Sequence, residues 1–442
     1  MNTILFNILQ VPVPKDIPLD MPLPHWLLVF LLIFSFLLHI LFVNLMIGGT
    51  ALTLWAEIMG LKRKEYYEVS REIEKTVTLN KSLAVVLGVA PLLSINVLYT
   101  VYFYSANALT GLFWISIVPL VTVAFLLGYW HKYTWEKLRN NRALHIAIIG
   151  GATLIYFFVP FIFLTNINLM QFPEKWNEVD GFFSAMTLAN VFPRYLHFIA
   201  ASFAVTGLFV FWLFGRKSYA FEEHVRGFTR HEIRKKAMSL AFAASIAQLV
   251  FGPLLFLTLP VVGIDWDLVI TIGAGVTAAI FAMVWMWNSI NVEAENMNRR
   301  FWPIVLALTI TVGFMGTGRQ LYRANALQTH QQAMKIKTEE YMKKAEEAKL
   351  ALERGEVQEA QTASLEGKQI FEQNCAVCHK EEDRLVGPPL KEIVPMYQGK
   401  KDALIAWIKQ PGKKREDYPP MPGFPQMEKE KLESVAEYMI SL

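Results

Sequence analysis

The fold of the C-terminal part of this 442-residue chain follows from one stretch, Cys375-Ala376-Val377-Cys378-His379. Its thiols are the only two cysteines in the chain. A C-x-x-C-H run is the attachment motif of a c-type haem, in which both thiols form thioethers and the histidine ligates the iron. A zinc site is the alternative, but zinc takes about four ligands, and neither His nor Cys follows His379. The motif therefore predicts one covalent haem c on Cys375, Cys378 and His379.

The second axial ligand of such a haem is usually a methionine, because a soft thioether raises the reduction potential. Met421 lies in Tyr418-Pro419-Pro420-Met421-Pro422-Gly423-Phe424, where the flanking prolines stiffen the chain. Met396 and Met427 are competing candidates, and filling the core is their simpler role. We expect Met421 to be the ligand.

The segment 364–442 resembles a class I cytochrome c domain over its whole length. Helical periodicity at both ends of the segment predicts its first and last helices. In that family these helices cross beside the haem, where a small residue meets an aromatic one, and Gly367 and Tyr438 match this pair. Gly387-Pro388-Pro389-Leu390 matches the loop that supports the histidine side. The resemblance implies a small all-α electron-transfer domain.

The part before residue 325 has the composition of a membrane protein, and the whole chain is 54% hydrophobic. About eight apolar runs approach the ~20 residues that a bilayer-spanning helix needs. The expected spans are 26–57, 79–104, 109–131, 143–170, 192–215, 237–261, 266–290 and 301–321. We therefore predict an all-α chain: a membrane-embedded bundle over 1–325, a charged helical linker over 326–363, and the cytochrome domain over 364–442. Gly355 is expected to end the helix of the linker.

Basic residues mark the side of the membrane on which each connection lies, because they are retained in the cytoplasm. Four connections are rich in them: Lys62, Arg63, Lys64, Arg71 and Lys75; Lys132, Lys137, Arg139 and Arg142; Arg216, Lys217, Arg226, Arg230, Arg234, Lys235 and Lys236; Arg299 and Arg300. An even number of spans then places both termini in the periplasm of a bacterial inner membrane, the side on which haem c is attached. Residues 1–24 lack the features of a cleavable signal peptide and are expected to form an irregular surface segment. The net charge of +4 lies in these loops and calls for no nucleic acid.

Histidines inside membrane spans are candidate functional groups, because burying an ionisable side chain is costly. His39 and His197 lie within the first and fifth expected spans. As neutral imidazoles they would ligate the iron of haem b, and the expected number of b haems is between zero and two. The alternative is that each is satisfied by a neighbouring helix. We expect His131 and His145 at the interface and His330 in solvent.

The membrane part, over residues 26–323, resembles subunit I of the cytochrome bd quinol oxidases. The matching stretches occur in order on successive helices: Leu38–Val43 with Gly48-Gly49, Gly88-Val89-Ala90, Leu164–Pro173, Arg194–His197 with Val205-Thr206-Gly207, and Gly318-Arg319-Gln320. In that family the first-helix histidine ligates the oxygen-reactive haem, and the fifth-helix histidine ligates a b-type haem. The resemblance therefore implies haem ligation by His39 and His197. It also implies that Arg319 and Gln320 lie near haem propionates, where a guanidinium suits a carboxylate.

Departures from that family argue against oxygen reduction. Gly316 occupies the position of a haem-ligating Glu, and no Met between Asp265 and Ala282 replaces the ligand of the seventh helix. No Asp or Glu occurs between Glu74 and Glu136 to deliver protons. The quinol-binding loop is also reduced, to Val261-Val262-Gly263-Ile264-Asp265.

Three functions are consistent with these features. The first is a respiratory electron-transfer subunit that passes electrons between the quinone pool, or a membrane partner, and a periplasmic cytochrome or other redox protein. It would be part of a quinol:cytochrome c type oxidoreductase complex, with other subunits as partners. The second is a scaffold without membrane haem that tethers one cytochrome c to a partner complex. The third is a divergent bd-type terminal oxidase subunit.

Overall fold

The computed structural model describes residues 21–353, 359–413 and 415–441, and every regular element in these ranges is helical. The all-α prediction is therefore confirmed. The chain divides into two compact units, one ending at Ile336 and the other beginning at Lys337, a point inside the predicted linker. The expected N-terminal surface segment lies mostly outside the described residues, and so does Gly355, the expected end of the linker helix.

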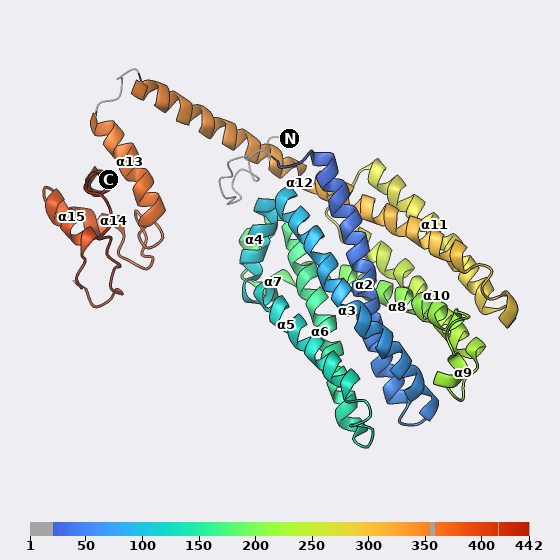
Figure 1. Ribbon diagram of the computed structural model, residues 1–442. Coiled ribbons are helices and arrows are strands. Elements are labelled where there is room, and N and C mark those ends of the chain that lie inside the picture. Colours follow the sequence, from blue (N-terminus) through green and yellow to red (C-terminus); the bar gives the residue numbers. More distant parts are fainter. Residues whose placement is uncertain (1–20, 354–358, 414, 442) are drawn as a thin grey trace. The chain divides into compact units, whose positions relative to one another are not determined.

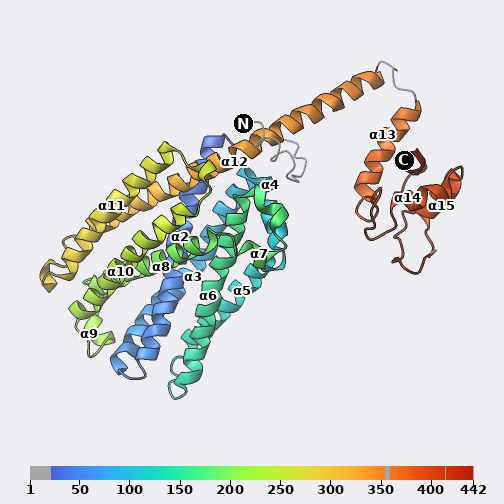
Figure 2. The same cartoon turned by 180° about the vertical axis from the view of Figure 1, so that it is seen from behind.

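The first unit is a bundle of long helices (Figure 1) and is seen from behind in Figure 2. The long helices are α2 (His25–Met59), α3 (Lys64–Leu98), α4 (Thr100–Thr110), α5 (Leu112–Tyr133), α6 (Arg142–Met170), α8 (Val191–Gly215), α10 (Arg230–Leu257), α11 (Trp266–Ile290) and α12 (Phe301–Glu353). Short helices lie between them: η1 (Pro173–Glu178), α7 (Phe182–Ala185), α9 (Phe221–His224), η2 (Val261–Gly263) and η3 (Ala294–Asn296). Helix α2 occupies a central position, because it packs against α3, α6 and α8.

Within the described residues, seven helices are long and apolar enough to cross a membrane: α2, α5, α6, α8, α10, α11 and α12. Helix α3 makes an eighth if its halves, Lys64–Val77 and Ser82–Leu98, count as one span with a bend of 42°. The second expected span, 79–104, has different bounds in the structure. Tyr99 leaves the helical conformation (φ −136°, ψ 38°), so α3 ends at Leu98 and α4 continues from Thr100.

Large apolar side chains cover the outside of the bundle, which is the distribution expected of a membrane protein. Leu112, Val118 and Leu154 expose 78%, 73% and 72% of their surface, whereas Thr53 and Ser202 are fully buried. In water this exposure would cost roughly 25 cal/mol per Å². In lipid the apolar surface costs little, and polar groups must instead find partners inside the protein.

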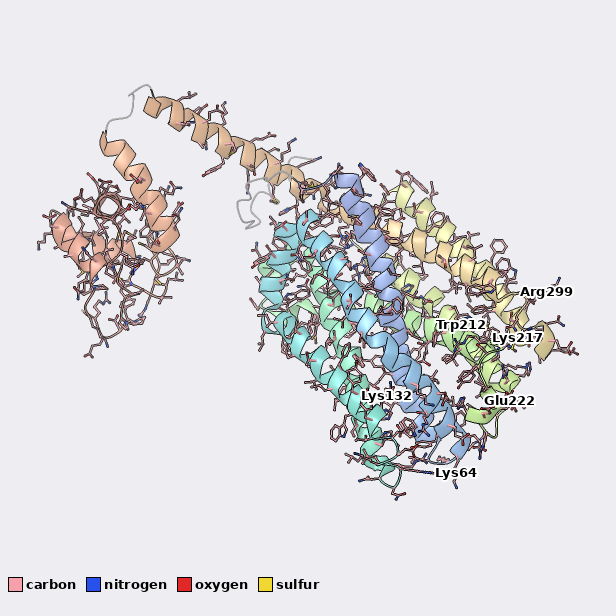
Figure 3. All side chains as sticks on the ribbon, in the orientation of Figure 1. Lys64, Lys132, Trp212, Lys217, Glu222 and Arg299 are labelled. Carbon is pink, nitrogen blue, oxygen red and sulfur yellow. The ribbon has the colours of Figure 1, made fainter. Side chains whose placement is uncertain are left out.

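The basic connections gather at one end of the bundle, as the distribution of charge in the sequence predicted. Figure 3 shows Lys64, Lys132, Lys217 and Arg299, one from each basic connection, toward the same ends of the helices. These connections join α2 to α3, α5 to α6, α8 to α10, and α11 to α12. We call the end of the bundle at which these four connections lie the basic end.

The second unit contains α13 (Glu359–Asn374), α14 (Leu390–Tyr397), α15 (Lys401–Lys409) and α16 (Lys429–Ser441). Helices α13 and α16 cross at Gly367, where a Cβ atom would lie 1.9 Å from the Ser434 carbonyl oxygen and 2.8 Å from Tyr438 Cβ. No side chain fits at that distance, so the crossing requires glycine. The Tyr438 ring packs against Phe371, with centroids 5.7 Å apart. The predicted meeting of Gly367 with Tyr438 is confirmed.

Replacing Gly367 with valine should therefore separate α13 from α16. We expect G367V to lower the free energy of unfolding of the second unit by about 3 kcal/mol, at the upper end of the usual overpacking cost. Urea titration of the full chain, followed by haem absorbance, measures the change. G412A is the matched control, because its Cβ would lie 3.6 Å from Trp407, an ordinary contact. Equal midpoints for the two variants would contradict this account of the crossing.

Candidate cofactor sites

The two thiols of the second unit lie on one helical turn that follows α13. The Cys375 amide donates to the Phe371 carbonyl oxygen at 2.8 Å, and the His379 amide donates to the Cys375 carbonyl oxygen at 2.9 Å. Residues three apart on a helix share a face, so Cys375 and Cys378 are placed to reach one planar ligand together. Both are free cysteines, and burial raises the pKa of the Cys375 thiol to about 11.

His379 is buried and has a defined tautomer. Its Nδ1 lies 2.8 Å from the Pro388 carbonyl oxygen. A carbonyl oxygen only accepts, so Nδ1 donates the proton and Nε2 keeps a lone pair for a metal. Gly387 permits this contact, because a Cβ there would lie 2.4 Å from His379 Cε1. The histidine is thus oriented by a main-chain group, as metal-ligating histidines usually are.

These residues fit a covalent haem c. The site offers two free thiols on one turn and an imidazole whose Nε2 is available to iron. When bound, such a haem accepts and releases one electron at its iron.

The three methionine candidates for the second axial position differ in their surroundings. Met396 is 51% exposed, and Met427 packs against the core of the second unit. Met421 is half-buried in a loop that is held at both sides. The Arg384 guanidinium donates to the Asp417 carbonyl oxygen at 2.6 Å, and the Phe424 amide donates to the Ile408 carbonyl oxygen at 3.0 Å. Met421 remains the predicted ligand.

His39, on α2, shows the same local pattern as His379. Its Nδ1 lies 2.7 Å from the Ala84 carbonyl oxygen of α3, so Nδ1 donates and Nε2 keeps its lone pair. A Cβ at Gly88 would lie 2.8 Å from His39 Cε1, so the ring also depends on a glycine. Two of the stretches that resemble the oxidases, around His39 and around Gly88, are therefore in contact.

His197, on α8, faces α10. Its Cε1 would lie 3.6 Å from a Cβ at Gly252, an ordinary contact, and the Gln248 carbonyl lies beside the ring. Its Nδ1 is buried and makes no hydrogen bond of normal geometry. The ring is thus held less firmly than that of His39.

Three arginines lie near one another, and two of them lie about one helical turn from these histidines. Arg194 precedes His197 by three residues on α8, and the Arg319 guanidinium lies 4.5 Å from the centroid of the Phe36 ring, one turn before His39. Arg323, on the same helix as Arg319, is only 3% exposed. The three guanidinium groups are near enough to repel one another. The sequence had indicated only Arg319 of this group for a binding role.

Among the described residues, only neutral side chains accept hydrogen bonds from these arginines. Arg194 donates to the Asn190 and Gln171 side-chain oxygens at 2.9 and 3.0 Å. Arg323 donates to Gln320 Oε1 at 3.1 Å, and Gln320 in turn donates to the Tyr99 hydroxyl at 2.7 Å. The Nε atoms of Arg319 and Arg323 are buried without a hydrogen-bond partner. A buried charge without its partner costs about 3–5 kcal/mol, so the cluster fits an anionic ligand.

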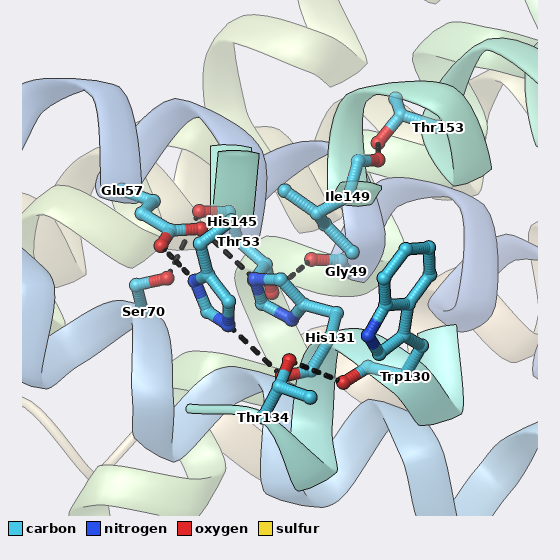
Figure 4. Close-up of polar contacts among 10 residues, drawn as sticks. All are labelled: Gly49, Thr53, Glu57, Ser70, Trp130, His131, Thr134, His145, Ile149 and Thr153. Atoms are coloured by element: carbon cyan, nitrogen blue, oxygen red, sulfur yellow. Dashed lines mark hydrogen bonds and ion pairs between the residues drawn. The ribbon is translucent and has the colours of Figure 1, made fainter. Parts of the chain in front are cut away.

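Three other histidines are covered by neighbouring helices. His131 and His145, expected at the interface, lie near the ends of α5 and α6 at the basic end, but they are only 0% and 1% exposed and meet Glu57, as Figure 4 shows. His330, expected in solvent, is 6% exposed and lies 3.0 Å from the Tyr102 hydroxyl. Helix α12 continues past the expected span, and this brings His330 against α4. The spacing of single residues does not indicate such contacts between helices.

Comparison with known families assigns the C-terminal part. The cytochrome c family model matches residues 364–442, so this segment is a class I cytochrome c domain, and it implies a covalent haem c. No cytochrome bd family model matches the membrane helices. No curated protein matches the chain.

The contact between Gly387 and His379 can be tested with a single methyl group. We expect G387A to lower the haem c content per chain several-fold, because its Cβ would collide with the imidazole at 2.4 Å. The pyridine haemochrome assay measures this content. G412A adds the same methyl group where it makes only an ordinary contact with Trp407. Full haem content in G387A would contradict the proposed support of His379.

The predicted axial role of Met421 can be tested by its effect on the reduction potential. We expect M421A to lower the potential by roughly a tenth of a volt or more, since axial ligands set haem potentials over a range of ~0.8 V. Potentiometric titration of the c-type band measures the shift. M396A, which truncates an exposed methionine, should leave the potential unchanged. A shift in M396A with none in M421A would reverse the assignment.

Proposed function

We propose that the chain is a respiratory electron-transfer subunit of a bacterial inner membrane, with both termini in the periplasm. Electrons pass between the quinone pool, or a membrane partner, and a periplasmic acceptor through the haem c of the cytochrome c domain. One observation carries this proposal. The domain that presents two thiols and an oriented His379 imidazole is joined by α12 to a bundle of membrane-crossing helices.

The surface next to the haem motif supports exchange of electrons with a protein partner. Val377 precedes Cys378, and Leu385 and Val386 precede Gly387, whose amide donates to the Cys378 carbonyl oxygen at 2.7 Å. These three apolar side chains are 70%, 42% and 51% exposed. Exposed apolar side chains grouped in this way are typical of interaction sites. A periplasmic redox protein that docks there would come close to the haem attachment site.

The arginine cluster supports a haem within the membrane bundle. Haem propionates are anionic, and the buried Arg323 and half-buried Arg194 and Arg319 provide positive charge with no acidic partner among the described residues. Arg194 lies one turn from His197, and Arg319 lies over Phe36, one turn from His39. We propose that these two histidines hold one or two b haems, through which electrons reach the cytochrome c domain.

The surroundings of Gly316 argue against bd-type oxygen reduction. A Cβ there would lie 3.3 Å from Leu37 Cδ2 and 3.6 Å from Ile33 Cγ2. A carboxylate in place of Gly316 would face aliphatic side chains, so this position has no room prepared for the ligand that the oxidases use. Electron transfer without oxygen chemistry is the better proposal.

A haem count decides between the electron-transfer subunit and the scaffold. We expect the purified full chain to contain one haem c and at least one haem b in the pyridine haemochrome assay. H39A and H197A should each reduce the b-type bands by half or more and leave the c-type band unchanged. Truncating a haem ligand removes the iron–nitrogen bond that retains a non-covalent haem.

His224 provides a matched control, because it is exposed and lies outside the membrane spans. H224A should keep the spectrum of the wild type. Only c-type bands in the wild type would overturn the membrane-haem part of the proposal and favour the scaffold. Oxygen uptake that is lost in H39A would instead favour the oxidase.

A further inference from the structure

Glu57, His131 and His145 form a buried cluster at the basic end of the bundle, between α2, α5 and α6 (Figure 4). The three residues are 0%, 0% and 1% exposed. His131 Nε2 lies 2.9 Å from Glu57 Oε2, and His145 Nδ1 contacts Glu57 Oε1. One possible ligand atom from each residue lies within 4.8 Å of the others. This cluster takes no part in the proposed electron transfer.

The Glu57 carboxylate has no cationic side chain to balance it. Among the described residues its ion-pair contacts are with the two histidines alone, and neither Lys nor Arg contacts it. A fully buried carboxylate is strongly disfavoured unless positive charge accompanies it. The positive charge must therefore lie at the cluster itself, as a proton or as a bound cation.

The hydrogen bonding of His145 shows where the charge is missing. His145 Nε2 lies 2.9 Å from the His131 carbonyl oxygen. A carbonyl only accepts, so Nε2 carries the proton, and the neutral ring then turns the lone pair of Nδ1 toward Glu57 Oε1. Two lone pairs that face each other repel. Something positive therefore belongs between Nδ1 of His145 and the carboxylate.

The geometry of the two imidazoles favours a metal cation in this place. The rings stack with centroids 3.8 Å apart and an interplanar angle of 21°, and both direct nitrogen atoms at one carboxylate. Two imidazoles and one carboxylate form a typical donor set for zinc, with a fourth position for water. The contact of His145 with the His131 carbonyl is the orienting contact that metal-ligating histidines make.

Aromatic side chains keep bulk water away from the cluster. The Trp135 ring meets the rings of His131 and His145 edge-on, at 5.2 and 4.9 Å between centroids. Tyr67 packs on Trp135 at 4.8 Å, and the Arg142 guanidinium lies 4.0 Å from the centroid of the Tyr67 ring. An ion in this place would join three helices under an aromatic cover.

We propose that Glu57, His131 and His145 bind one divalent cation of the zinc class. Imidazole ligands disfavour magnesium and calcium, which prefer oxygen. The ion replaces the missing positive charge and fixes α2, α5 and α6 to one another at the basic end.

The test is metal analysis of the purified full chain in detergent. The protein is stripped with a chelator, incubated with zinc chloride, desalted and analysed by mass spectrometry for zinc. We expect about one zinc per wild-type chain and an affinity at least tenfold weaker in H131A, H145A and E57Q. E57Q preserves the volume of the side chain and removes its charge. H224A, which truncates an exposed histidine, should retain the wild-type affinity.

A second readout guards against variants that fail to fold. X-ray absorption at the zinc edge of the wild-type protein should show two imidazole ligands. Size-exclusion elution and haem c content show whether each variant remains intact. Stoichiometric zinc with two imidazoles would support the site. A wild-type chain that binds no zinc, or zinc that the three variants retain at full affinity, would overturn it and leave a shared proton as the neutralising charge.

Discussion

The hydrogen bond from Nδ1 of His379 to the Pro388 carbonyl oxygen, 2.8 Å long, determines what the second unit can bind. The acceptor is a main-chain oxygen, so the proton stays on Nδ1 and Nε2 is left as the ligand. Gly387 makes this contact possible, because any larger residue would occupy the space of the ring. The helical turn that follows α13 then places two thiols beside that ligand. Cofactor attachment and cofactor chemistry therefore depend on one oriented imidazole.

The membrane unit carries two electrostatically incomplete clusters at opposite ends. Near the start of α8, Arg194, Arg319 and Arg323 collect positive charge with no acidic partner among the described residues. At the basic end, Glu57 is buried, and in the part of the chain that the structure describes only His131 and His145 form ion-pair contacts with its carboxylate. Burial of an uncompensated charge costs several kcal/mol, and this cost applies to Arg323 in the first cluster and to Glu57 in the second. One cluster therefore favours an anion and the other a cation, which is the physical basis for the two proposals, haem propionates at the first and zinc at the second.

Much of this arrangement could be predicted from the sequence where the signal is local. The haem motif occupies five consecutive residues, and apolar runs of sufficient length indicate the spans directly. The meeting of Gly367 with Tyr438 was predictable only because 364–442 resembles a known family. The break at Tyr99 was not predictable, since it depends on a backbone conformation inside an apolar run.

Contacts between helices that are distant in the chain could not be predicted from the sequence. His131 and His145 looked interfacial because they lie near charged loops, yet they are buried against Glu57, 74 and 88 residues away in the chain. His330 looked solvated because polar residues follow it, yet α12 holds it against Tyr102. In each case the position along the chain did not indicate that a partner helix covers the side chain.

Intact mass spectrometry of the mature chain, followed by peptide mapping, tests the central claim most directly. The account predicts that the chain gains the mass of one haem and that the peptide containing Cys375 and Cys378 carries it. A mature chain without this addition, or a haem that dissociates from both cysteines under denaturing conditions, would contradict the account.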